Sequence, residues 1–194
     1  MKSYPSRRLW LLQTTVALAL VVPSISPCLA QSSAPAAPPV PQPGLELVLT
    51  VTAEIEPAIT MGQTPQGVRR VIPISGGSFE GPGLKGVILP GGEDWQVDRP
   101  DGVTEFDARY WLRTDDGVII RVHNRCIAAQ PAAELEKAAR GEVVDRSKTY
   151  LRTAPVFEAP IGRYDWLNKA IFIGTLSPGN GPRPAVVLRF YKVN

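Results

Sequence analysis

Four charged residues have the side chains that acid–base catalysis requires, and three of them are carboxylates. A carboxyl group held among glycines and apolar side chains has a raised pKa and can exchange protons near neutral pH. An arginine beside it could hold an oxyanion or a carboxylate. The same residues also fit structural roles, with Asp94 capping a turn and Arg152 paired with Glu158 on the surface. The catalytic candidates are Glu80, Asp94, Arg152 and Glu158.

Aromatic and amide side chains indicate a second kind of site, a cavity for a small apolar ligand. Such pockets have mostly apolar walls and a few polar groups that orient the ligand. Aromatic residues can equally serve as ordinary core filling. The candidate ligand-binding residues are Trp95, Tyr110, Asn124, Trp166 and Asn168.

The histidine and cysteine content excludes several common chemistries. His123 is the only histidine, so a Ser-His-Asp site or a zinc site would depend on it alone. Cys28 and Cys126 are the only cysteines, and Cys28 lies in a segment that we expect to be removed. The sequence has no nucleotide-binding fingerprint. We therefore expect neither a metal ion nor a cofactor.

Alternating hydrophobicity predicts a mostly β domain that has to position these side chains. In Leu45–Ile55 every second residue is apolar, with Val48 as the one exception. Pro131–Arg140 has the start, composition and glycine stop of a short helix. About eight or nine strands with one helix indicate a closed antiparallel β-barrel or a sandwich, and short connections favour an up-and-down order. The other expected strands are Val68–Ile74, Leu84–Leu89, Val103–Arg113, Val118–Cys126, Tyr150–Phe157, Trp166–Thr175 and Ala185–Val193.

The hairpin formed by Val103–Arg113 and Val118–Cys126 has two competing registers. A two-residue loop, Asp116–Gly117, would mix charged and apolar residues on both faces. A three-residue loop, Asp115–Gly117, with a left-handed glycine at its end, separates the two classes almost completely. We predict the second register, because a one-residue slip moves every side chain to the opposite face. It pairs Leu112 with Ile120, Tyr110 with Val122, Ala108 with Asn124 and Phe106 with Cys126.

This register assigns the chemically interesting residues of the hairpin to opposite faces. His123 falls between Arg121 and Arg125 on the charged face, which favours a surface role. Cys126 falls on the apolar face, which favours an inert, buried thiol. Asn124 lies on the same face, where an unpaired amide is costly. Either it bonds the backbone at a strand end, or it points into a cavity and orients a ligand.

The first 30 residues have the order of a secretory signal peptide. Lys2, Arg7 and Arg8 precede the apolar run Leu9–Val22, and cleavage after Ala30 fits the small residues there. The apolar run is shorter than the roughly 20 residues that span a bilayer. We therefore expect a periplasmic or secreted protein without a stable membrane anchor, with the twin-arginine route as one alternative.

Removal of this segment changes the charge of the working protein. The chain has 21 Lys and Arg and 18 Asp and Glu, and the signal carries three of the basic residues. Subtracting them leaves 18 of each sign and a net charge of zero, which argues against a nucleic-acid or anionic-membrane partner. Residues 31–44 form a Pro- and Ala-rich linker. Residues 45–194 suit a single domain.

A glycine-rich block, Ile74–Trp95, contains seven glycines but lacks the features of a phosphate loop. Glycines in strands mark bulges, sharp barrel corners or places where a ligand nears the backbone. The motifs in and after this block resemble the bacterial and fungal family called domain of unknown function 3237, or uncharacterised protein family 0311. They are Gly76-Gly77, Glu80-Gly81-Pro82-Gly83-Leu84, Leu89-Pro90-Gly91-Gly92, Asp94-Trp95, Arg99-Pro100-Asp101-Gly102, Asp107-Ala108-Arg109-Tyr110, Arg113-Thr114-Asp115-Asp116-Gly117, Asn124, Tyr150-Leu151-Arg152-Thr153, Pro155-Val156-Phe157-Glu158, Tyr164-Asp165-Trp166-Leu167-Asn168 and Tyr191-Lys192-Val193.

The resemblance covers nearly all of residues 45–194 and implies a compact, calycin-like antiparallel β-barrel and a homodimer. It implies no settled activity. One departure is Cys126, where the family pattern leads us to expect glycine, and its side chain would narrow a cavity at that point. We therefore predict an exported protein that binds a small apolar or aromatic molecule in a barrel cavity. The alternative is a cofactor-independent acid–base enzyme acting on such a molecule, and a purely structural role would require no cavity at all.

Overall fold

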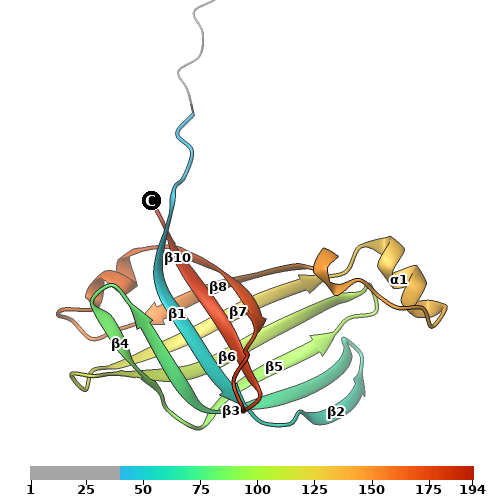
Figure 1. Cartoon of the computed structure of the whole chain (residues 1–194), viewed down its shortest axis with the longest axis horizontal. Helices are drawn as coiled ribbons and strands as arrows, with labels where there is room; N and C mark the ends of the chain where they lie inside the picture. The colour runs from blue at the N-terminus through green and yellow to red at the C-terminus, as the bar shows by residue number, and fades with distance from the viewer. Residues whose placement is uncertain (1–39) are drawn as a thin grey trace, which may run out of the picture. The chain divides into compact units, whose positions relative to one another are not determined.

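Ten β-strands, one α-helix and two 3-10 helices make up residues 40–194, the part of the chain that the computed structural model describes (Figure 1). The expected signal peptide and most of the expected linker lie outside the described residues. The strands are β1 (Leu45–Ile55), β2 (Ile59–Thr64), β3 (Gly67–Gly81), β4 (Leu84–Ile88), β5 (Gly92–Asp98), β6 (Val103–Thr114), β7 (Ile119–Ala129), β8 (Tyr150–Glu158), β9 (Phe172–Pro178) and β10 (Ala185–Val193). The helices are α1 (Ala132–Ala139), η1 (Arg146–Lys148) and η2 (Asp165–Lys169).

The strands close into an antiparallel barrel because β1 pairs with both β10 and β3. From β5 onward each strand pairs with the next one in the chain, which confirms the up-and-down order. The short strands β4 and β5 both bridge β3 and β6, so together they fill one position of the barrel. The expected closed barrel with one short helix is confirmed.

The β6–β7 hairpin has the three-residue loop. Leu112 pairs with Ile120, and the backbone N–H of Thr114 donates to the carbonyl of Val118 at 2.9 Å. Gly117 has φ 85°, the left-handed conformation that this turn requires. Leu112 and Ile120 are both 0% exposed, so the predicted assignment of inner and outer faces is confirmed.

A β-bulge explains the irregular alternation in β1. The pairing of β1 with β10 shifts between Leu47 and Leu49, which leaves Val48 as the extra residue. Val48 and Leu49 are consequently both buried, whereas Leu45 and Leu47 are exposed. The inward-facing apolar series therefore begins at Leu49 and not at the start of the strand.

The glycine-rich block lets two strands approach closely where the barrel closes. Gly77 on β3 pairs with Ala53 on β1 and has φ 130°. A Cβ atom at Gly77 would lie 2.0 Å from the carbonyl oxygen of Thr52, far inside van der Waals contact. Gly77 therefore serves barrel closure, which is the structural role among the alternatives that the sequence left open.

One half of the barrel is filled by apolar side chains, and η2 covers that end. Phe157 packs edge-to-face on Phe172, with ring centroids 5.0 Å apart. Leu167 of η2 is buried in the same cluster, and the Tyr164 hydroxyl donates to the Asp116 carboxylate at 3.1 Å, which ties η2 to the β6–β7 turn.

The expected strand Trp166–Thr175 is wrong at its N-terminal half. Residues 165–169 form η2, and β9 begins only at Phe172. The amide of Asn168 forms two 2.8 Å hydrogen bonds, one with the N–H and one with the carbonyl of Ala159. These bonds hold the turn in place, and the expectation overlooked them because it followed hydrophobicity alone.

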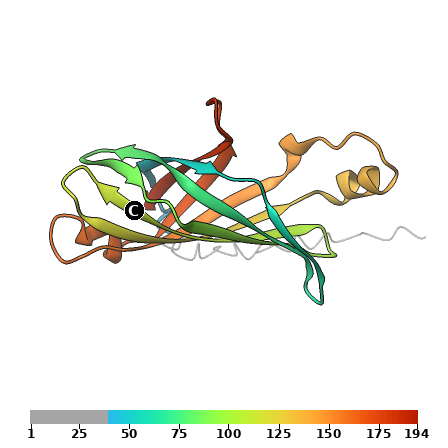
Figure 2. The ribbon, with the colours of Figure 1, turned by 90° about the horizontal axis from the view of Figure 1, so that it is seen from below.

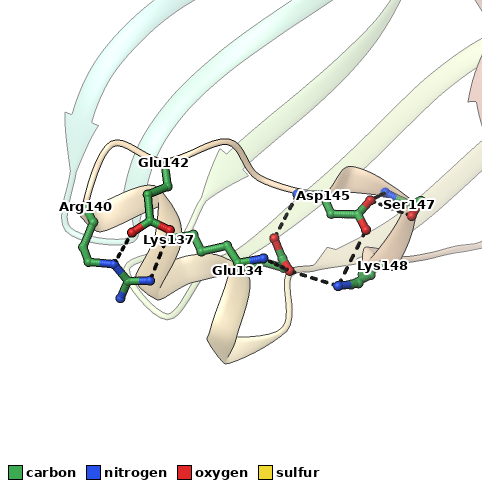
Figure 3. A network of polar contacts seen from close by, with 7 residues as sticks. All are labelled: Glu134, Lys137, Arg140, Glu142, Asp145, Ser147 and Lys148. Atoms are coloured by element: carbon green, nitrogen blue, oxygen red, sulfur yellow. Dashed lines mark hydrogen bonds and ion pairs between the residues drawn. The ribbon is translucent and has the colours of Figure 1, made fainter.

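The excursion between β7 and β8 carries α1 and is held by one buried carboxylate (Figure 3). Glu134 is 2% exposed and accepts hydrogen bonds from the backbone N–H of Asp145 and from Lys137, both at 2.9 Å. Lys148 lies 3.4 Å from the same carboxylate. The excursion and the β2–β3 hairpin project from the same end of the barrel (Figures 1 and 2).

Candidate functional site

The half of the barrel that leads toward α1 is not completely filled by side chains. It contains a cavity of about 80 Å³ between strands β1, β3, β5, β6, β7, β9 and β10. Apolar side chains form most of its wall, and a few polar side chains interrupt them. The lining residues are Ala53, Ile55, Ile72, Ile74, Asp94, Gln96, Phe106, Ala108, Tyr110, Asn124, Cys126, Leu176, Val186 and Leu188.

Two polar atoms of this wall are buried without a hydrogen-bond partner. They are Oδ1 of Asp94, on β5, and the hydroxyl oxygen of Tyr110, on β6. Buried polar groups are nearly always paired in folded proteins, because an unpaired one costs about 1–3 kcal/mol. Two such atoms in one small apolar cavity are therefore the strongest indication of a ligand site in the described residues.

Strand alternation places Asp94 and Gln96 on the inner face of β5, since residues two apart in a strand share a face. The Gln96 amide donates to Oδ2 of Asp94 at 2.6 Å, and Nε of Arg70 donates to Oε1 of Gln96 at 2.8 Å. Arg70 also forms an ion pair with Asp98, which accepts a 2.7 Å hydrogen bond from Thr104. A continuous polar chain therefore leads away from the cavity along the inner faces of β3, β5 and β6.

The electrostatics of the cavity favour neutral side chains. Burial raises the pKa of Asp94, and hydrogen bonds from the Gln96 side chain and the Asp107 backbone oppose that rise only in part. Burial and then the neighbouring charge of Asp94 raise the pKa of Tyr110 far above its usual range. The same two causes raise the pKa of the Cys126 thiol to about 12. Cys126 is therefore a protonated thiol at neutral pH and a poor nucleophile.

The sequence left two roles open for Asn124, a hydrogen bond to the backbone or a place in a cavity wall. The structure shows it in the cavity wall, with a hydrogen bond to a side chain. It lines the cavity, and its Oδ1 accepts a hydrogen bond from the Thr153 hydroxyl of β8. Both residues are buried. An amide oxygen has two lone pairs, so both the NH₂ group and the second lone pair of Oδ1 of Asn124 remain for a ligand in the cavity.

Three of the five candidate ligand-binding residues lie outside the cavity. Trp95 faces the outer surface, where its indole N–H donates to Glu93 at 2.9 Å. Trp166 packs at the opposite end, with its ring 6.0 Å from that of Phe172. Asn168 is occupied by its two bonds to Ala159. The structure therefore brings together Tyr110 and Asn124 but not the whole expected set.

The expected catalytic set is also divided, with only Asp94 in the cavity. Glu80 is exposed on β3, opposite Lys85 of β4. Glu158 is exposed and forms a 2.9 Å ion pair with Arg121. Arg152 is exposed too, with its guanidinium 5.6 Å from the centre of the Tyr150 ring. The surface pair suggested between Arg152 and Glu158 does not form.

His123 lies on the outer face, as expected, but its neighbour there is a carboxylate. Its Nε2 is 2.9 Å from Oδ1 of Asp107. In residues 40–194 no group of three or more His, Cys, Asp or Glu side chains is arranged to hold a metal ion. None of the helices described there has both the length and the apolar character needed to span a membrane.

Gln96 and Arg70 are the site residues that sequence reasoning missed. The signal for Gln96 was its spacing of two from Asp94, but the run Gly92–Asp98 is too polar to read as a strand by hydrophobicity. The signal for Arg70 was weaker, since it becomes an inner residue only once the pairing of β3 with β5 is known.

Comparison with known proteins gives a consistent result. The sequence pattern of a family described as "Protein of unknown function (DUF3237)" matches residues 43–193, which is almost the whole of the barrel. The chain belongs to this family. The resemblance recognised in the sequence motifs is thereby confirmed.

Several DUF3237 relatives are similar over most of their length. A UPF0311 protein from Rhodopseudomonas palustris is 42% identical over 128 residues, which cover 66% of this chain and 84% of the relative. A UPF0311 protein from Clostridium acetobutylicum is 39% identical over 152 residues, covering 77% and 93%.

Solved structures show the same barrel. A β-barrel-like protein from Acinetobacter baumannii has 32% identity and a TM-score of 0.67, covering 80% of this chain and 99% of its own. An enzyme from Penicillium herquei has 23% identity and a TM-score of 0.59, covering 81% and 98%. At that identity the second likeness shows the DUF3237 fold alone.

Proposed function

We propose that the barrel binds a small, mostly apolar molecule that carries one oxygen function. The observation that carries this proposal is the pair of buried, unpartnered oxygens of Asp94 and Tyr110 in a mostly apolar cavity. A ligand oxygen between them would satisfy both groups and recover the free energy that each loses when unpaired. The Asn124 amide is a further donor on the same wall.

The cavity volume sets the size of the molecule. About 80 Å³ exceeds the share of one liquid water, which is about 30 Å³, and falls short of the roughly 150 Å³ cavity that accepts benzene. We therefore expect a ligand with a ring of five atoms or a short branched chain, or a larger molecule that inserts only such an end.

Three probes of matched shape test this proposal: cyclopentanol, cyclopentanone and cyclopentane. Each is titrated into the ¹³C-methyl-labelled protein, and the NMR signals of Ile74 and Leu188 are followed. We expect the two oxygenated probes to bind about tenfold more tightly than the hydrocarbon, because only they can pair with the buried oxygens.

Filling the cavity provides the control for these titrations. The substitution Ala108→Leu places a larger side chain on the cavity wall and should abolish the shifts, whereas Ala154→Leu on the exposed face of β8 should not. Equal binding by Ala108→Leu and the wild type would contradict the proposal, as would methyl signals unaffected by every probe.

Acid–base catalysis is the second candidate function, and the buried carboxyl of Asp94 beside Tyr110 favours it. A carboxyl group with a raised pKa can remove and return a proton at the carbon next to a ligand carbonyl. The test is exchange of the α-hydrogens of cyclopentanone for deuterium in heavy water, followed by proton NMR. We expect faster exchange with the wild type than with Asp94→Asn, and equal rates would remove this function.

Export is proposed on the pattern of residues 1–30 alone. Expression of the full chain in a bacterium, followed by N-terminal sequencing of the periplasmic protein, tests it. We expect a mature protein that begins at Gln31. Recovery of an uncleaved chain from the cytoplasm would contradict the proposal.

A further inference from the structure

The side-chain types of Arg70, Gln96 and Asp94 determine which atom donates and which accepts in each hydrogen bond between them. A guanidinium group has five donors and no acceptor, so the Gln96 atom that lies 2.8 Å from Nε of Arg70 must be the amide oxygen. The NH₂ group of Gln96 is then the atom that faces Asp94, and it can only donate. Oδ2 of Asp94 therefore always acts as an acceptor in this arrangement.

A proton on Asp94 has only one remaining position. Placing it on Oδ2 would set two donors against each other across the 2.6 Å contact with Gln96. Oδ1 is free of this conflict, because it is buried and has no hydrogen-bond partner. The hydrogen that the carboxyl group gains or loses on titration is consequently carried by the oxygen left for the ligand.

We propose that Arg70 and Gln96 confine the proton of Asp94 to Oδ1, so that the cavity selects a carbonyl oxygen when the proton is present and a hydroxyl group when it is absent. This inference rests on the proposed ligand-binding function and specifies its ligand chemistry. Arg70 and Gln96 are positioning residues, because they act on the ligand through Asp94.

The selection follows from counting donors and acceptors. With the proton in place, Oδ1 of Asp94 and the Tyr110 hydroxyl are two donors, which together suit the two lone pairs of a carbonyl oxygen. Without the proton, Oδ1 is an acceptor, and a ligand hydroxyl can donate to it while accepting from Tyr110. Tyr110 remains neutral in both cases, because burial raises its pKa far above the range in which Asp94 titrates.

Other titratable or charged groups lie around Asp94 on β5 itself and on the neighbouring strands β3, β6 and β7. Asp107 on β6 acts in both directions, because its backbone N–H favours the ionised form and its charge opposes it, and Arg70 on β3 favours the ionised form. Asp98 on β5 is paired with Arg70, and Cys126 on β7 is a neutral thiol. The cavity residues of β1, β9 and β10 have no charge to contribute: Ala53, Ile55, Leu176, Val186 and Leu188.

The test compares cyclopentanone and cyclopentanol as a function of pH. Dissociation constants of both probes are measured by methyl NMR from pH 4 to pH 9, and the titration of Asp94 is followed by its ¹³C carboxyl signal. For the wild type we expect the preference to change from the ketone to the alcohol as Asp94 ionises, by about tenfold in the ratio of the two constants.

Two variants fix the preference in opposite directions. In Asp94→Asn the new amide must turn its oxygen to Gln96 and its NH₂ to the cavity, so the ketone should be preferred at every pH. In Gln96→Glu the new carboxylate accepts from Arg70 and draws the Asp94 proton to Oδ2, so the alcohol should be preferred. Glu93→Gln, on the outer face of the same strand, is the matched control and should behave as the wild type.

The outcomes separate this inference from the proposed function. If both probes bind but their ratio is independent of pH, or if the two variants shift it in the same direction, the inference is overturned and the binding function stands. If neither probe binds to the wild type, both are overturned. NMR signal dispersion of each variant reports whether it has folded, and either variant alone tests the direction of the shift.

Discussion

The hydroxyl group of Thr153 donates a hydrogen bond to Oδ1 of Asn124, and both side chains are buried between β7 and β8. This bond fixes the orientation of an amide that forms part of the cavity wall. It also lies beside the pairing of β8 with β9, which involves the single residue pair Thr153 and Gly174. Thr153 therefore supports both the candidate site and the least extensively paired seam of the barrel.

Replacing Thr153 by valine should destabilise the protein by about 1–3 kcal/mol. Valine keeps the shape of the side chain but removes the hydroxyl group that lies within hydrogen-bond distance of both Oδ1 of Asn124 and the backbone carbonyl of Arg125. Urea denaturation measures the change, and Thr60→Val on the exposed strand β2 should shift the free energy of unfolding by less than about 0.5 kcal/mol. Equal effects of the two substitutions would show that the buried bond contributes nothing.

The close approach of β1 and β3 predicts a strong effect of Gly77→Ala. The new Cβ would meet the carbonyl oxygen of Thr52 at 2.0 Å, so the strands must separate. Gly62→Ala shares the unfavourable positive φ but meets nothing within 4 Å. We expect Gly77→Ala to be less stable than Gly62→Ala by about 1–3 kcal/mol, measured by denaturation. Similar losses in both variants would leave backbone conformation alone as the cause.

Glu134 should make the α1 excursion sensitive to acid. The hydrogen bond from Asp145 and the contacts with Lys137 and Lys148 lower the pKa of this carboxyl group. A lowered pKa stabilises the fold above the ordinary glutamate pKa of about 4.3, and the contribution is lost as the pH falls through the folded value.

Hydrogen exchange of residues 132–149 tests this expectation. The wild type should protect these amides better than Glu134→Gln at pH 7, and the difference should narrow toward pH 3. Glu136→Gln, on the same helix, is the matched control. A constant difference between wild type and Glu134→Gln at both pH values would contradict the assignment.

Cys126→Gly should enlarge the cavity, since the thiol forms part of its wall. We expect cyclohexanone to bind this variant more tightly than it binds the wild type, at a loss of about 1–3 kcal/mol in stability. Cys126→Ser keeps the volume of the side chain and should not improve binding. Methyl NMR titration measures the affinities, and an unchanged affinity of Cys126→Gly would show that Cys126 does not limit the cavity.

Much of the fold could be predicted because its signals are local. The bounds of β1 and β10 match the apolar alternation of Leu45–Ile55 and Ala185–Val193, and the β6–β7 register follows from one turn and the separation of charge. These predictions needed no knowledge of distant strands. The strand β2 was missed because its residues are mostly exposed and it therefore lacks a buried face.

The site was harder to predict because it breaks the pattern on which strand prediction depends. Asp94 and Gln96 occupy inner positions of β5 that a packed barrel would fill with apolar residues. Hydrophobicity therefore hid the strand where the candidate chemistry lies. Trp95 and Glu158 have suitable side chains, but their strand positions face solvent, and only the register of the whole sheet shows this.

The barrel begins and ends at the same place, since Gly44 and Asn194 exchange two backbone hydrogen bonds of 3.2 and 3.0 Å. A short peptide joining these residues would therefore make the polypeptide continuous without rearranging any strand. New ends could then be opened at an exposed turn such as Asp115–Gly117. Such a circular permutant would move both free ends to the β6–β7 turn while the cavity and its polar chain stay intact.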